Sequence, residues 1–112
     1  MTFKTLLATV TFGLSLGLAA VPVLADGNRV TLEQYGVGNG AGLGQSGYGN
    51  YMDVLQDGYS NTTIATQSGL YNDLSVGQFG VGNEAYVDQS GYGNSAGVLQ
   101  AGEGNVAVVH QQ

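Results

Sequence analysis

Two polar residue types recur along this chain every eleven residues. Glutamine keeps that step from residue 34 to residue 111, and asparagine keeps it from residue 28 to residue 105. A glycine follows each of the first seven glutamines by two positions, so one unit reads Asn-x-apolar-x-apolar-x-Gln-x-Gly-x-x. The repeated residues are Asn28, Asn39, Asn50, Asn61, Asn72, Asn83, Asn94 and Asn105; Gln34, Gln45, Gln56, Gln67, Gln78, Gln89, Gln100 and Gln111; and Gly36, Gly47, Gly58, Gly69, Gly80, Gly91 and Gly102. A fixed period of this kind is the signature of a repeat architecture.

Each unit predicts one β-strand followed by one turn. In the unit that begins at Asn72, steps of two residues reach Leu74, Val76 and Gln78, and this alternation places the four side chains on one face of a strand. An eleven-residue period also occurs in right-handed coiled coils. Recurrent Gly-x-Gly-Asn segments, such as residues 47–50, would however interrupt each helix. The same glycines supply the positive-φ positions that a tight turn requires.

Pairs of units form a longer repeat of 22 residues. Serine follows glutamine at positions 46, 68 and 90, whereas the alternate units carry other residues there. Two strands therefore make one rung, and eight strands predict an all-β, cross-β solenoid of four rungs spaced about 4.8 Å apart. The inward pairs are Val30/Leu32, Ala41/Leu43, Met52/Val54, Thr63/Ala65, Leu74/Val76, Ala85/Val87, Ala96/Val98 and Ala107/Val109.

In such a stack every asparagine lies over an asparagine and every glutamine over a glutamine. Their side-chain amides are expected to bond to the same residue one rung away, as in the amide ladders of cross-β assemblies. Such pairing would satisfy polar groups that face inward. The alternative is that the asparagines and glutamines occupy solvated turn edges.

The first 25 residues stand outside the repeat and predict a cleaved secretory signal. They contain one lysine, Lys4, then an apolar stretch, and they end in Val23-Leu24-Ala25, which has the small-x-small character of a cleavage site. A membrane anchor is the alternative, but the apolar run is shorter than the roughly 20 residues of a spanning helix. We therefore predict a signal at residues 1–25 and a repeat domain at residues 26–112.

The composition of residues 26–112 argues against several classes of function. Eight acidic residues and one basic residue, Arg29, give a formal charge of −7, which disfavours nucleic acid and anionic membranes. The chain has no cysteine and one histidine, His110, so a nucleophile with its base or a metal cluster cannot be assembled in the usual way. The acidic residues do not recur at the same position in adjacent rungs. We expect no catalytic, cofactor or metal site, and hence no enzyme.

The pattern Gln-x-Gly-x-Gly-Asn-x-Ala-x-x-x-Gln occurs in full at residues 34–45, 78–89, 89–100 and 100–111. It closely resembles the curlin repeat of the bacterial curli subunits. The resemblance covers residues 28–112 and implies a secreted functional amyloid that assembles into cell-surface fibres of the biofilm matrix. It also implies a nucleator subunit, an outer-membrane secretion channel and periplasmic chaperones as partners.

Departures from the family pattern leave alternatives open. Met52, Thr63 and Leu74 replace the alanine, and only Asp26 and Gly27 separate the predicted signal from Asn28, where the major curli subunit carries a glycine-rich export segment. A polymerising subunit is favoured over a nucleator of the same fibre. A rival from another class is a soluble solenoid that binds ice or glycan through its outer face, but the outward threonines Thr31, Thr62 and Thr66 do not stack.

The last strand is the predicted starting edge of assembly. Residues 105–112 carry Val106 and Val108 outward and Val109 inward, with no acid and no proline among them. Segments with high β propensity and low charge are preferred sites of cross-β assembly.

Overall fold

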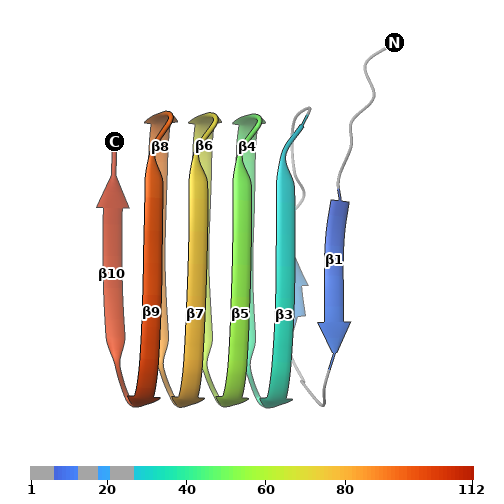
Figure 1. Cartoon of the computed structure of the whole chain (residues 1–112), viewed down its shortest axis with the longest axis vertical. Coiled ribbons are helices and arrows are strands. Elements are labelled where there is room, and N and C mark those ends of the chain that lie inside the picture. The colour runs from blue at the N-terminus through green and yellow to red at the C-terminus, as the bar shows by residue number, and fades with distance from the viewer. Residues whose placement is uncertain (1–6, 13–17, 21–26) are drawn as a thin grey trace.

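The computed structural model of the chain describes residues 7–12, 18–20 and 27–112, and all of its regular elements are β-strands. The repeat region forms a β-solenoid in which successive strands alternate between two facing sheets (Figure 1). Its eight strands are β3 (Arg29–Val37), β4 (Gly40–Tyr48), β5 (Tyr51–Tyr59), β6 (Thr62–Leu70), β7 (Asp73–Val81), β8 (Glu84–Tyr92), β9 (Ser95–Glu103) and β10 (Val106–Gln111).

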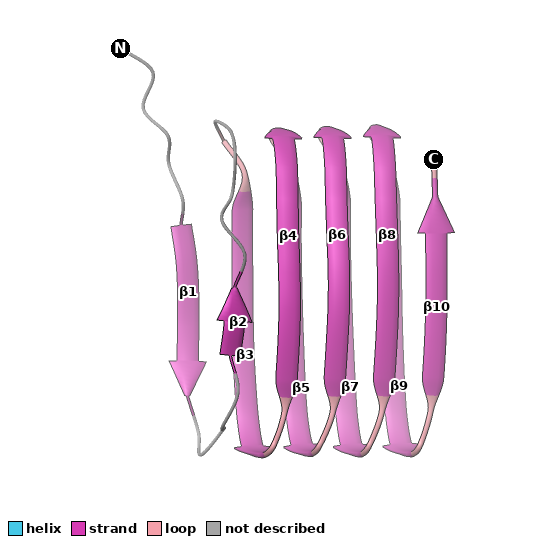
Figure 2. Cartoon of the chain, turned by 180° about the vertical axis from the view of Figure 1, so that it is seen from behind, coloured by secondary structure: helices cyan, strands magenta, loops and turns pink. Residues whose placement is uncertain are grey.

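The two sheets are parallel throughout. One has the order β1-β3-β5-β7-β9 and the other β10-β8-β6-β4-β2, where β1 is Leu7–Phe12 and β2 is Leu18–Ala20. From β3 onward every strand residue pairs with the residue 22 positions away, such as Gln34 with Gln56. Figure 2 shows the second sheet from its outer side, with β4, β6 and β8 in front of β5, β7 and β9 of the first sheet. The predicted all-β solenoid of 22-residue rungs is confirmed.

The core is the thin layer between the two sheets. Its buried apolar members are Leu32, Ala41, Leu43, Met52, Val54, Ala65, Leu74, Val76, Ala85, Val87 and Val98, with Val30, Ala96, Ala107 and Val109 partly buried against them. These fifteen residues are the apolar residues expected to face inward. Alternation along each strand produces this arrangement, because period-two apolar residues share one face.

The corners of the solenoid are tighter than the four-residue turns expected from the sequence. Strand pairing continues past the first glycine of each Gly-x-Gly-Asn segment, so β4 ends at Tyr48 and β5 begins at Tyr51. Gly47 bends the strand with a φ of 102°, and Gly49 completes the reversal with a φ of 68°. Two residues, Gly49 and Asn50, are therefore left between the strands.

The predicted signal segment lies partly outside the described residues, which leave out residues 1–6, 13–17 and 21–26. In the part that is described, β1 pairs with residues 29–34 of β3, and β2 pairs with residues 41–43 of β4. The described residues include no helix that is long and apolar enough to cross a membrane.

Candidate functional site

The inward glutamines form one continuous chain of side-chain hydrogen bonds along each sheet. In the first sheet the Nε2 of Gln56 donates to the Oε1 of Gln78 at 2.8 Å, and Gln78 donates to Gln100 at 2.8 Å. In the second sheet Gln67 donates to Gln89 and Gln89 donates to Gln111, both at 2.8 Å. Every one of these bonds points from a rung to its C-terminal neighbour, so the ladders have a direction.

From Gln45 to Gln111, each repeat glutamine also donates across the core to the opposite sheet. Gln78 Nε2 donates to the backbone carbonyl of Thr62 at 3.0 Å, and Gln56 Nε2 donates to that of Gly40 at 3.0 Å. Gln45, Gln67, Gln89, Gln100 and Gln111 make the corresponding bond to the carbonyl 16 residues earlier. Because a carbonyl only accepts, this contact determines which end of each side-chain amide is the nitrogen. The glutamines therefore tie the two sheets together as well as adjacent rungs.

The asparagines tie the corners rather than the strands. Asn50 Nδ2 donates to the carbonyl of Ser46 at 2.9 Å, which closes its own corner. It also donates at 3.1 Å to the carbonyl of Gly69, in the corner stacked one rung further along the axis. Its Oδ1 accepts from both the backbone N and the Nδ2 of Asn72, at 3.0 and 3.1 Å. All asparagines from Asn28 to Asn83 are buried, while Asn94 and Asn105 at the C-terminal end are less covered.

Among the described strands, Thr63 is the only polar residue at an inward position that is otherwise apolar, and the glutamine ladder supplies its hydrogen-bond partners. Its Oγ1 donates to Gln78 Oε1 at 2.9 Å and accepts from Gln56 Nε2 at 3.2 Å. A fully buried hydroxyl thus replaces alanine without leaving a polar atom unpaired. The repeat pattern carries no signal for this contact, because the contact depends on the rotamers of the side chains.

The two ends of the ladders differ in chemistry. At the N-terminal end of the second sheet, the buried Oε1 of Gln45 accepts no hydrogen bond. At the C-terminal end, Gln100 and Gln111 donate to the backbone carbonyls of Glu84 and Ser95, and β9 and β10 are the last described strands of their sheets. On β10, Val106 and Val108 are 64% and 75% exposed, and Val109 packs against the core. The strand expected to act as the assembly edge is therefore an apolar edge strand.

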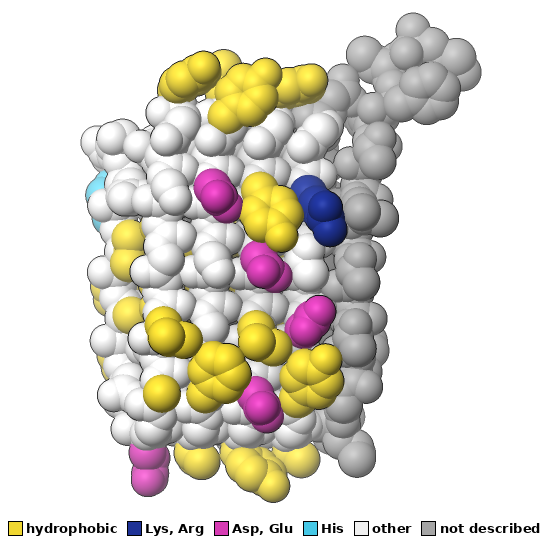
Figure 3. All heavy atoms as spheres, in the orientation of Figure 1, with side chains coloured by type: hydrophobic (Ala, Val, Ile, Leu, Met, Phe, Trp, Pro, Cys, Tyr) yellow, Lys and Arg dark blue, Asp and Glu magenta, His cyan; other side chains and the backbone are white. Residues whose placement is uncertain are grey.

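The outer faces carry the acidic residues, and no two acids are register partners in the described strands. Acidic and hydrophobic side chains are interspersed over the outer face of the first sheet, and further hydrophobic side chains lie along both corner edges (Figure 3). On β8, Tyr86 donates to Glu84 at 3.3 Å, and the Glu84 carboxylate raises the pKa of this phenol through its charge and this bond.

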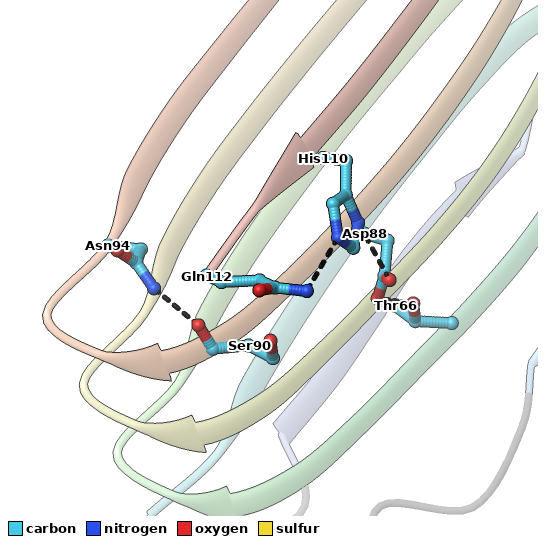
Figure 4. A network of polar contacts seen from close by, with 6 residues as sticks. All are labelled: Thr66, Asp88, Ser90, Asn94, His110 and Gln112. Carbon is cyan, nitrogen blue, oxygen red and sulfur yellow. Dashed lines mark hydrogen bonds and ion pairs between the residues drawn. The ribbon is translucent and has the colours of Figure 1, made fainter.

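His110 points outward from β10 and lies beside an acidic residue. Its Nδ1 lies 3.1 Å from Asp88 Oδ2, and Asp88 Oδ1 accepts from Thr66 at 2.7 Å (Figure 4). These groups come from three consecutive strands of one sheet and are exposed to solvent. Within the described residues, no three histidine or acidic side chains gather closely enough to hold a metal ion.

A row of three tyrosines at one corner was not anticipated from the sequence. The ring of Tyr71 contacts those of Tyr48 and Tyr92, with centroid distances of 5.7 and 6.0 Å. The sequence did contain one indication of this row, since Tyr71 stands at a repeat position where the other three rungs carry glycine.

These features define the class of the protein: a parallel β-solenoid whose repeats are joined by directional amide ladders and whose end strands are open. The profile of the curlin associated repeat matches residues 25–54, 49–80 and 81–112. The chain belongs to the curlin repeat family, and this membership supports a curli-type fibre subunit. Among curated proteins no relative matches this chain.

Proposed function

We propose that this chain is a polymerising subunit of a secreted, curli-type amyloid fibre that contributes to biofilm matrix and surface adhesion. The observation that carries the proposal is the direction of the glutamine ladders. Within the chain the glutamine of each strand presents its amide donor to the C-terminal neighbour and its acceptor to the N-terminal neighbour. Two like ends would place donor against donor or acceptor against acceptor. Copies are therefore expected to stack head to tail.

Stacking of this kind would continue the 22-residue register from one copy into the next. Strand β9 of one copy would meet β3 of the next, and β10 would meet β4, so that the Gln111 amide faces the unpartnered Gln45 Oε1. An unpaired polar atom buried between two copies would cost about 1–3 kcal/mol, and in this register the Gln111 amide supplies its partner. The open backbone edges of β9 and β10 gain ladder partners in the same step.

The proposal also includes export of the subunit from the cell. Residues 1–25 are proposed to be a secretory signal whose removal frees the edges of β3 and β4, which β1 and β2 otherwise occupy. The subunit is then secreted through an outer-membrane channel, with periplasmic chaperones preventing early assembly and a nucleator subunit starting fibres at the cell surface. These partners follow from the curlin resemblance, and the family match supports a fibre-forming role.

The direct test is to incubate purified residues 26–112 alone. We expect thioflavin fluorescence to rise after a lag, and fibre diffraction to give the reflection near 4.8 Å that arises from strand spacing along the axis. A chain that stays monomeric, folded and non-aggregating would overturn the proposal and favour a soluble solenoid.

A pair of glycine variants tests the head-to-tail register. In the earlier rungs, a Cβ on the first corner glycine would lie 1.9–2.0 Å from the carbonyl oxygen of the next rung's glycine, as at Gly80 against Gly102. Gly102 itself has no such neighbour within one chain, but Gly36 of the next copy would lie there. Gly102→Ala is therefore expected to stop fibre growth. Gly104→Ala is the matched control, because Gly104 also has a positive φ, of 68°, but faces open space. Equal growth of both variants would contradict the register.

A further inference from the structure

One corner of the solenoid carries an exposed row of aromatic side chains. Tyr48 ends β4 and Tyr92 ends β8, and the residue that pairs with both of them is Leu70 of β6. Tyr48 and Tyr92 are thus two rungs, or about 10 Å, apart along the axis. That separation is too long for ring contact. In Figure 3 this corner is the top edge, where hydrophobic side chains cluster.

Tyr71 bridges the gap by adopting an unusual backbone conformation. Its φ is 55°, at a corner position where Gly27, Gly49 and Gly93 have φ values of 74°, 68° and 66°. For a bulky residue such a conformation is strained. It directs the ring between those of Tyr48 and Tyr92, with interplanar angles of 84° and 80°. Gly49 makes room for it, since a Cβ there would lie 2.7 Å from Tyr71 Cδ1.

The remaining tyrosines of the repeat domain have other neighbours. Tyr59 lies at the opposite corner, between its register partners Val37 and Val81. Tyr51 lies under the Arg29 guanidinium at 5.6 Å, and Tyr86 bonds to Glu84. Tyr35 pairs with Asp57. Among the described residues, contact between tyrosine rings is therefore confined to Tyr48, Tyr71 and Tyr92.

We propose that Tyr71 is the centre of an oxidative cross-linking site and forms dityrosine with Tyr48 or Tyr92. The co-reactant is a one-electron oxidant, such as a peroxidase that uses hydrogen peroxide. Each of two phenols loses one electron and one proton, and the resulting tyrosyl radicals join through their ortho carbons. The ortho hydrogens then move to the oxygens and both rings regain aromaticity. The two electrons and two protons reduce one hydrogen peroxide to two waters, so the step balances.

Exposure and proximity favour this reaction at this corner. The relative exposures of Tyr48, Tyr71 and Tyr92 are 48%, 54% and 74%, so an oxidant reaches each ring. Either bond would join consecutive rungs covalently. The chain has no cysteine with which to make such a link by other means.

The test is oxidation of the full chain, folded and at neutral pH, with peroxidase and hydrogen peroxide. We expect dityrosine fluorescence, an intact mass lower by two hydrogens for each bond, and digestion products that join the segment around Tyr71 to that around Tyr48 or Tyr92. Tyr71→Phe keeps the aromatic packing but cannot couple, so both links should be lost. Tyr59→Phe is the matched control and should leave them unchanged.

Two results would overturn the proposal. One is undiminished dityrosine in Tyr71→Phe, with an unchanged β-sheet circular dichroism spectrum. The other is a product dominated by Tyr59 or by pairs of tyrosines that lie apart in the fold. Denaturation in urea should also abolish the preference for Tyr71. Both tyrosines of a link belong to one chain, so the reaction needs the folded solenoid but no contact between copies. The test is therefore made on material whose circular dichroism shows β structure, and failure of the link in that material is separate from failure of fibre formation.

Discussion

At the scale of single residues, an inward glutamine has more hydrogen-bond partners than any outward side chain. Gln78 donates to Gln100 and to the Thr62 carbonyl, and accepts from Gln56 and Thr63. Gln78→Ala leaves buried groups unpaired at about 1–3 kcal/mol each, so the lag before fibre formation should lengthen. Ser75→Ala and Tyr86→Ala, which change outward residues, should have much smaller effects in the same thioflavin assay. Equal lags would mean that the inward register is wrong by one residue.

The corner glycines differ in how much space surrounds them, although all have a positive φ. A Cβ at Gly58 would lie 1.9 Å from the Gly80 carbonyl oxygen, whereas Gly82 has nothing within 4 Å. Gly58→Ala should therefore prevent the rungs from stacking, while Gly82→Ala adds only the strain of a left-handed residue, about 1–2 kcal/mol. Ser60 and Tyr71 already occupy positions equivalent to Gly82 and Gly49 in other rungs. Circular dichroism of assembled material measures the difference, and similar β content in both variants would contradict it.

At the scale of the strand, β10 combines an open edge with apolar side chains on both faces. Val108→Asp places a charge on this edge, where Val108 pairs with Tyr86, and charges at such positions oppose cross-β pairing. We expect a longer lag than for Thr31→Asp, because β3 already carries the charged Arg29 and Glu33. A chain truncated after Gly104 should also assemble more slowly. If the truncated chain assembles as fast as the full repeat domain, β10 does not drive assembly.

The strands and their inward residues were predictable because period and alternation determine them. A 22-residue repeat with apolar residues at every second position allows few arrangements other than two stacked parallel sheets. Side-chain direction was not predictable in the same way. The common direction of the glutamine amides, the insertion of Thr63 between Gln56 and Gln78, and the placement of Tyr71 over Gly49 depend on rotamers and on one strained φ. The shortened corners were missed because strand pairing continues around the first glycine.

At the scale of the whole molecule, the core is thin for a chain without disulfides. Fifteen apolar residues face inward, and five of them are alanines. Larger side chains contribute roughly 1.5–3 kcal/mol each, against an ordering cost of about 1.5 kcal/mol per residue. Freshly diluted residues 26–112 should therefore be largely unfolded and gain β structure only as they assemble. Cooperative thermal unfolding of a fresh monomer, measured by circular dichroism, would contradict this expectation.

Charge opposes assembly across the whole molecule. Residues 26–112 carry eight acidic residues and one basic residue, a formal charge of −7. Four rungs span about 19 Å at the usual strand spacing. A stack of copies therefore holds one net charge per roughly 3 Å, which approaches the density of one per about 1.7 Å in DNA.

Salt should relieve this repulsion, since the screening length falls from about 30 Å at 0.01 M to about 10 Å at 0.1 M ionic strength. We expect the thioflavin lag of residues 26–112 to shorten as sodium chloride is raised over that range. The double variant Asp53→Asn and Asp73→Asn, which removes two outward charges from one sheet, should assemble faster at low salt and respond less to added salt. Ser75 pairs with Asp53 and stands two residues after Asp73 on β7. The control variant Ser75→Asn changes no charge, so its salt response should match that of the unmodified chain. A lag that is unaffected by salt in all three proteins would mean that hydrophobic and amide contacts alone determine the rate of assembly.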